Sequence, residues 1–143
     1  MHQDYVFLLP APNEIVALPH ARYVELVQGR LALPQYAGQQ IRLGIVYVRM
    51  RNGQPAQAVN TTFSLLDFDA TGHARPHPGK FSLEQNHAFY EAVRNSPYED
   101  VDYDPEVQAL RRTLRDEFAW TPSDKEQRLM LDHIFASAPP AAQ

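Results

Sequence analysis

The chain has 143 residues, a length that suits one domain with an independent core. Apolar residues make up 44% of it and charged residues 21%, and the formal net charge of -4 argues against nucleic acid as the main partner, because nucleic-acid-binding domains usually carry a basic surface. The absence of cysteine excludes disulfides, thiolate metal sites and cysteine nucleophiles.

The first ten residues do not have the features of a secretory leader. They lack a positively charged start, and their apolar run is too short. No stretch of the sequence approaches the roughly 20 apolar residues of a membrane span. We therefore expect a cytoplasmic protein that does not enter membranes.

The N-terminal part is predicted to form short strands separated by prolines. Tyr5–Leu9 and Glu14–Leu18 are strand candidates, and Arg22–Val27 and Arg30–Leu33 are candidates for a further pair. Prolines recur through this region, which favours strands over helices. A helix over His20–Gln28 remains open as an alternative, because several of its apolar residues would share one face.

The strongest local signal is a β-hairpin over Ile41–Phe68. Asn52 and Gly53 tolerate the positive φ angles of a type I′ turn, and runs rich in β-branched and aromatic residues flank them. The two-residue turn sets a register in which Met50 faces Pro55. Because proline has no N–H, Pro55 indicates that no further strand pairs with the hairpin tip on that side.

Both faces of this hairpin are predicted to be apolar. Continued without interruption, the register places Tyr47 opposite Ala58 and Leu43 opposite Thr62. One face then carries Val46, Val48, Met50, Val59, Phe63 and Leu65, and the other carries Ile41, Leu43, Ile45, Tyr47, Leu66 and Phe68. A strand that is apolar on both sides needs cover on both sides. We expect helices on one face, without a choice of which, and on the other a sheet layer, a curled barrel wall, a ligand or a second copy.

The second half of the chain is predicted to be helical. After a turn at Asp69–Gly72, the capping box Ser82–Gln85 begins one helix. Asp104, followed by proline, caps a second helix, and Thr121–Asp124 begin a third in the same way. The predicted core positions of these helices are Leu83, Phe89, Tyr90, Val93, Val107, Leu110, Leu114, Phe118, Leu129, Met130, Ile134 and Phe135.

Strands in the first half and helices in the second favour an α+β fold. We predict a single domain over residues 1–137, with an antiparallel sheet of about five or six strands followed by three helices. Residues 138–143, which are mostly alanine and proline, are predicted to be a disordered tail.

Three groups of residues suggest metal binding, and each has a simpler explanation. Asp67–Gly72 resembles the start of a calcium loop, but Pro78 occupies the place of the bidentate glutamate, so we predict a strand-ending turn. The carboxylates of Glu99–Asp104 are favoured by the dipole of the helix that follows. The histidines that could bind zinc lie partly in a proline-rich extended stretch: His73, His77 and His87. We expect no metal and no cofactor.

The sequence contains no recognisable catalytic or nucleic-acid-binding motif. A nucleophile elbow, a phosphate-binding glycine loop and a dinucleotide fingerprint are all missing from it. Arg111, Arg112 and Arg115 fit a helix-turn-helix only loosely, because Asp116 and Glu117 dilute their charge. A solvated helix face is the better interpretation.

Polar residues project from one face of the predicted hairpin among apolar neighbours: Tyr47, Arg49, Asn60 and Thr62. They could line a ligand pocket or an interface, and we favour the interface because exposed apolar patches are often partner sites. The leading hypothesis is a non-catalytic cytoplasmic binding or interaction protein that forms a homodimer through the central hairpin. The alternative is a small enzyme or ligand carrier with a small molecule bound between sheet and helices.

Overall fold

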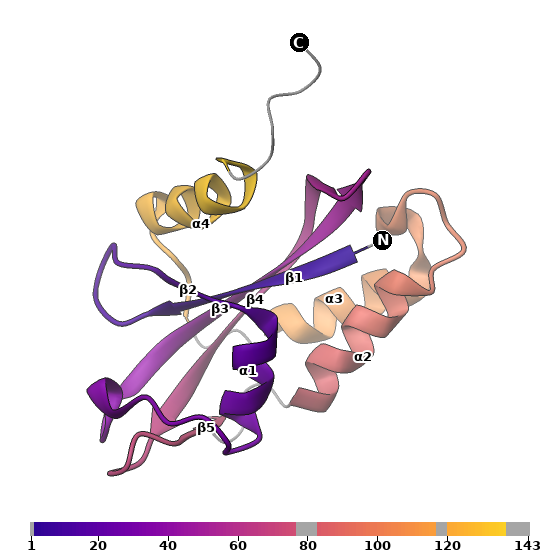
Figure 1. Ribbon diagram of the computed structural model, residues 1–143. Coiled ribbons are helices and arrows are strands. Elements are labelled where there is room, and N and C mark those ends of the chain that lie inside the picture. The colour runs from indigo at the N-terminus through magenta and orange to yellow at the C-terminus, as the bar shows by residue number, and fades with distance from the viewer. Residues whose placement is uncertain (1, 77–82, 117–119, 137–143) are drawn as a thin grey trace.

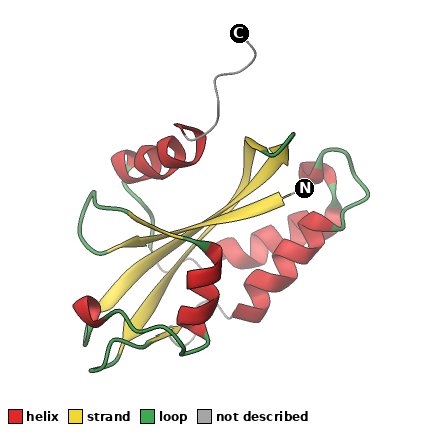
Figure 2. Cartoon of the chain, viewed as in Figure 1, coloured by secondary structure: helices red, strands yellow, loops and turns green. Residues whose placement is uncertain are grey.

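The computed structural model describes residues 2–76, 83–116 and 120–136. It confirms the α+β fold: one antiparallel sheet in the order β2-β1-β3-β4-β5, with most helices in the C-terminal half (Figures 1 and 2). The strands are β1 (His2–Leu9), β2 (Val16–Leu18), β3 (Gln40–Arg51), β4 (Gln54–Phe68) and β5 (Ala74–Pro76). The helices are α1 (His20–Val27), α2 (Leu83–Arg94), α3 (Pro105–Asp116) and α4 (Asp124–Ala136), with short 3₁₀ helices at Pro34–Tyr36 and Val101–Tyr103.

The predicted strand pair over Arg22–Val27 and Arg30–Leu33 is wrong, and the alternative of a helix over His20–Gln28 is confirmed by α1. Pro19 occupies the position just before the helix, with φ -56° and ψ 145°, where a missing N–H is tolerated. Gly29 then adopts φ +77°, and the N–H of Arg30 donates to the carbonyl of Glu25, an arrangement typical of a helix end. The residues up to Pro34 form a loop rather than a strand. Prolines therefore bound a helix here instead of excluding one.

The predicted hairpin turn is confirmed. Asn52 has φ +52° and Gly53 has φ +76°, as a type I′ turn requires, and Met50 pairs with Pro55. β5 pairs with β4 only at Leu66–Phe68, so no described strand lies beyond Pro55. The proline thus occupies an edge position, as its missing N–H predicted.

The uninterrupted register predicted beyond the turn is wrong. The register shifts on either side of Val48–Arg49, leaving Ala56 and Val59 as extra residues in β4. Tyr47 consequently pairs with Asn60 instead of Ala58. β-bulges are common in edge strands, where they increase twist and discourage pairing with another chain. The sequence pattern alone did not reveal the two bulges, because no particular residue type marks them in the sequence.

The sheet has an apolar core on each face, as predicted. Ile41, Leu43, Ile45 and Tyr47 face α1, α2 and α3, whereas Val46, Val48 and Phe63 share a cluster with Met130 and Ile134 of α4. Figure 1 shows α4 across the sheet from the other three helices. The second face therefore has a helix of the same chain as its cover, and not the sheet layer, ligand or second copy that we expected there. Homodimer formation stays a prediction.

Gly44 explains how closely α4 approaches the sheet. A Cβ atom at this position would lie 3.3 Å from the Met130 sulfur and 3.5 Å from the Phe63 ring. Both neighbours belong to the cluster beneath α4. The bare backbone of Gly44 thus makes room for the side chains that hold α4 in place.

The predicted core positions of the helices agree with the structure where it describes them. Five are buried: Phe89, Val93, Val107, Met130 and Ile134. Leu110, Leu129 and Phe135 are half-buried. The remaining predictions lie outside the described residues or side chains: Ser82, Leu83, Tyr90, Leu114, Phe118, His77, His87 and the tail. In the described ranges, none of the helices has the length and apolar character to cross a bilayer.

Candidate functional site

The outer edge of β1 is only partly covered by another strand. β3 pairs along the whole of β1 on one side, but β2 pairs only with Val6–Leu8 on the other. β2 ends at Leu18, and Pro19 turns the chain into α1. Among the described strands, none pairs with Gln3–Tyr5 on this outer side. An outer edge of this kind can pair with the backbone of a partner.

A hollow of about 230 Å³ lies along this open edge. Its apolar lining consists of Tyr5, Val6, Phe7, Ala17, Leu18 and Pro19, and its polar lining consists of Gln3, Asp4, His20 and His133. The two histidines come from α1 and α4, which cover opposite faces of the sheet (Figure 1). The hollow is therefore a groove at the sheet margin with a helix on either side.

Each wall of the groove has one histidine held in place. On the α1 side, Nδ1 of His20 lies 2.8 Å from Oδ1 and 2.9 Å from Oδ2 of Asp4. On the α4 side, the His133 ring meets the Phe7 ring edge to face, with 5.5 Å between centroids. The alternation of side chains along β1 places Asp4 toward α1 and Phe7 toward α4. An extended ligand along the edge would meet both walls.

The polar groups of the groove lining are carboxylate, imidazole, phenol and amide groups. The lining contains an imidazole beside a carboxylate but no serine, threonine, cysteine or lysine. Burial raises the pKa of the Tyr5 phenol, so this side chain stays protonated at neutral pH. Burial, with a smaller contribution from Asp4, does the same to the pKa of Tyr23. The groups present can bind a ligand by hydrogen bonds and apolar contact.

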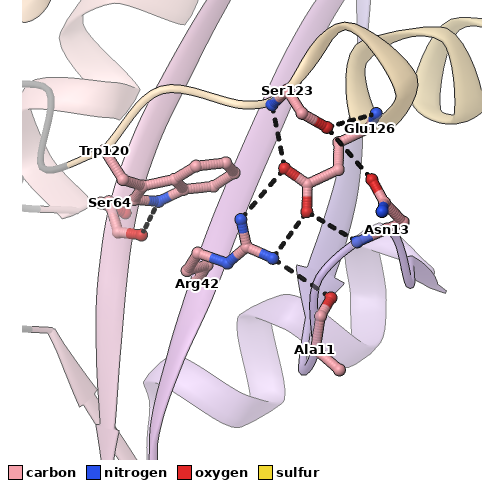
Figure 3. A network of polar contacts seen from close by, with 7 residues as sticks. All are labelled: Ala11, Asn13, Arg42, Ser64, Trp120, Ser123 and Glu126. Carbon is pink, nitrogen blue, oxygen red and sulfur yellow. Dashed lines mark hydrogen bonds and ion pairs between the residues drawn. The ribbon is translucent and has the colours of Figure 1, made fainter.

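A second polar cluster joins α4 to the sheet (Figure 3). Arg42 of β3 donates from Nη1 to Oε1 of Glu126 at 3.1 Å and from Nη2 to Oε2 at 2.7 Å. The Arg42 guanidinium also lies 4.9 Å from the centre of the Trp120 ring. The backbone N–H groups of Ser123 and Asn13 donate to the same carboxylate. Glu126 is therefore surrounded by donors.

This cluster is a structural clamp. Hydrogen bonds from Arg42, followed by those from Ser123 and Asn13, lower the pKa of Glu126 to about 2. A carboxylate so strongly held in its charged form is a poor proton shuttle near neutral pH. Ser123 and Glu126 also form a capping box for α4, because Oγ of Ser123 accepts from the N–H of Glu126 at 3.1 Å.

The sequence signal for this clamp was incomplete. A helix was predicted to begin at Thr121–Asp124 with Thr121 as its cap before a proline. The position is confirmed, but Ser123 is the cap, and Glu126, which we did not single out, completes the box. Its partner Arg42 is 84 residues away, and no local pattern connects the two. Trp120 extends the contact by donating from Nε1 to the carbonyl of Ser64 at 2.7 Å (Figure 3).

The strand-ending turn predicted at Asp69–Gly72 is confirmed. Oδ1 of Asp69 accepts from the N–H and hydroxyl of Thr71 and from the N–H of His73. These bonds, the Thr71 hydroxyl first, lower the pKa of Asp69 to about 2. Oγ1 of Thr71 also lies 2.7 Å from Nδ1 of His73. The Thr71 hydroxyl therefore belongs to the hydrogen-bond network that closes the turn.

The acidic loop between α2 and α3 uses its carboxylates as helix caps, as predicted. Oδ1 of Asp104 accepts from the N–H of Glu106 at 2.9 Å, and Oδ2 accepts from the hydroxyl of Ser96 at 2.6 Å. Oδ1 of Asp102 accepts from Arg111 at 2.9 Å. Within the described residues no group of three potential metal ligands comes together.

The four polar residues singled out in the hairpin differ in burial. Tyr47 and Thr62 are buried, and Tyr47 packs on Phe89 of α2 with 5.2 Å between ring centroids. Arg49 is half-buried near the hairpin tip. Asn60 pairs with Tyr47 through the backbone, and its side chain is not among those that the structure describes. Core packing accounts for Tyr47 and Thr62. A binding role for the set stays a prediction.

The chain matches no protein-family model, no curated protein sequence and no solved structure.

Proposed function

We propose that this chain is a non-catalytic binding protein that receives an extended polypeptide segment along the open edge of β1. The observation that carries the proposal is the unpaired outer side of Gln3–Tyr5, which lies in a groove between α1 and α4. Peptide-binding domains commonly add a ligand strand to an exposed sheet edge beside a helix. Main-chain hydrogen bonds then supply affinity, and alternate side chains supply specificity.

The chemistry of the groove suits an extended peptide. A ligand strand that pairs antiparallel to β1 would continue the line of β2 beyond Leu18. Its alternate side chains would point toward the Asp4–His20 pair on one wall and toward Tyr5 and His133 on the other. The lining has no serine, threonine, cysteine or lysine, the commonest nucleophiles, which favours binding over turnover.

The proposal can be tested by selecting peptides from a random-sequence display library on the full chain. Affinities of selected peptides are then measured by calorimetry against wild type and Ala17→Trp. Ala17 is exposed and lines the groove, so the indole should fill it without disturbing the core. We expect Ala17→Trp to weaken binding by at least about tenfold, a loss typical of blocking the centre of an interface.

The matched control is Ala70→Trp, the same substitution at an exposed position in the turn after β4. It should bind selected peptides as wild type does. Peptides N-methylated at alternate positions should lose affinity in one of the two registers, because main-chain pairing needs their N–H groups. Equal binding by wild type and Ala17→Trp, or a library that yields no binder, would refute the proposal.

A further inference from the structure

The loop between α2 and α3 presents two exposed tyrosines on a rigid frame. Tyr98 is 46% and Tyr103 is 72% exposed, and among the described large apolar side chains only Val16 is comparably exposed. Between them, Val101 is buried in the core under α2 and α3. Oδ1 of Asp100 accepts from the N–H of Asp102 at 3.0 Å and so caps the 3₁₀ turn. The tyrosines are exposed because the loop holds them outward.

Two carboxylates of this loop have no cationic partner among the described residues. Glu99 and Asp100 are exposed and form no ion pair among the described residues, whereas Asp102 pairs with Arg111. The sequence from Tyr98 to Asp104 contains four carboxylates and no lysine or arginine. Tyrosines beside uncompensated carboxylates suit a cationic partner surface, because rings and carboxylates both attract arginine.

The hairpin tip carries the opposite charge. Arg49 and Arg51 lie at the end of β3, and no acidic residue occurs in the sequence between Gln40 and Leu66. Arg42, at the far end of β3, is already paired with Glu126. Arg49 and Arg51 form no ion pair within the described residues, and Arg51 is exposed. Figure 1 shows the hairpin tip and the α2–α3 loop toward the same end of the molecule.

We propose that this end of the molecule docks against a second copy of the chain. The acidic tyrosine loop, Tyr98–Tyr103, of one copy meets the arginine tip, Arg49–Arg51, of the other. Because one chain carries both halves, a twofold axis forms the same contact twice. Charge complementarity sets the orientation, and the exposed tyrosines supply the aromatic anchors that dominate many interfaces. This surface shares no residue with the lining of the groove on β1 and does not depend on its ligand.

The test is the dimer dissociation constant of the full chain, measured by sedimentation equilibrium at about 0.05 M and about 0.5 M salt, which differ several-fold in screening length. Dimerisation should weaken at the higher salt. Arg51→Glu and Glu99→Arg should each raise the dissociation constant about fivefold or more, since reversal replaces attraction with repulsion in both symmetry-related contacts. An equimolar mixture of the two variants should recover association, because both contacts between them are then attractive: one is the native pair, and the other is the same pair with its charges exchanged.

The matched control is Glu14→Arg, the same charge reversal at an exposed position between β1 and β2. It should leave the dissociation constant unchanged, as should Ala17→Trp, which blocks the groove of the proposed function. Tyr103→Ala should weaken the dimer, and Tyr103→Phe should not. A monomer at every concentration up to about 1 mM, the weak end of measurable association, would overturn the proposal. A dimer that survives both charge reversals unchanged would do the same.

Discussion

Arg42 and Glu126 show how single side chains fix the position of a whole helix. Their pair joins a strand in the first half of the chain to the start of α4, and the Glu126 side chain is 4% exposed. A buried carboxylate is tolerated only when its lone pairs are satisfied, and here Arg42, Ser123 and Asn13 satisfy them. The pair determines where α4 begins on the sheet, and the apolar cluster under Met130 completes the contact.

Removing one partner of this pair should be costly. Arg42→Ala is expected to lower the free energy of unfolding by about 3–5 kcal/mol, because it leaves a buried carboxylate without its cation. Urea denaturation followed by circular dichroism measures the change. The matched control is Arg22→Ala, which breaks an exposed pair with Glu25 and should cost about 0.5 kcal/mol or less. Equal losses in the two variants would show that the clamp is not buried as described.

The same carboxylate predicts a pH dependence. The pKa of Glu126 falls from 4.5 to about 2 on folding. Its contribution to the free energy of unfolding is therefore complete above about pH 4.5 and is lost as the pH falls toward 2. The contribution at neutral pH is about 3 kcal/mol at most, from the size of the shift. Wild type should therefore lose its advantage over Glu126→Gln between these values in urea titrations. Because Asp69 and Asp104 have lowered pKa values too, the difference between the two proteins is the informative quantity.

At the scale of elements, the sequence correctly predicted the turns and caps whose conformation depends on neighbouring residues. The type I′ turn at Asn52–Gly53, the Asp104 cap and the turn at Asp69 needed only a few adjacent residues. Strands were favoured over α1 because of the recurring prolines, which here only bound the helix; the helix over His20–Gln28 was kept as the alternative. The bulges in β4 and the position of α4 depend on contacts between distant segments, which one sequence does not reveal.

The hairpin turn offers a test of that local chemistry. Gly53→Val should lower the free energy of unfolding by about 1–3 kcal/mol, because a β-branched residue resists the φ of +76° at this position. Gly53→Asn is the matched variant, since asparagine tolerates positive φ, and its loss should be clearly smaller. Thermal melts of wild type and both variants measure the two losses of stability. Similar losses for valine and asparagine would mean that the turn does not impose this φ in solution.

For the whole molecule, the two faces of the sheet are covered and its two margins differ. Along β4, two bulges and Pro55 discourage pairing with another strand. The Trp120 indole N–H also donates a hydrogen bond to the carbonyl of Ser64. Along β1, the short β2 leaves the outer side of Gln3–Tyr5 without a partner among the described strands. The sequence predicted that the hairpin needed two covers, but it attributed the second to a partner. The polar set in the hairpin did not point to the β1 groove, because Asp4, His20 and His133 are isolated in the sequence.

Amide hydrogen exchange along β1, measured by NMR on the free chain, tests the open margin most directly. The amides of interest point away from β3, so β2 or a bound partner is their available strand acceptor. The outward amides within Val6–Leu8 should exchange slowly because β2 covers them. The outward amides within Gln3–Tyr5 should exchange rapidly in the free chain, and their exchange should become slower when a selected peptide is added. Equally slow exchange along both stretches of the free chain would contradict the account, since the margin would then already be occupied.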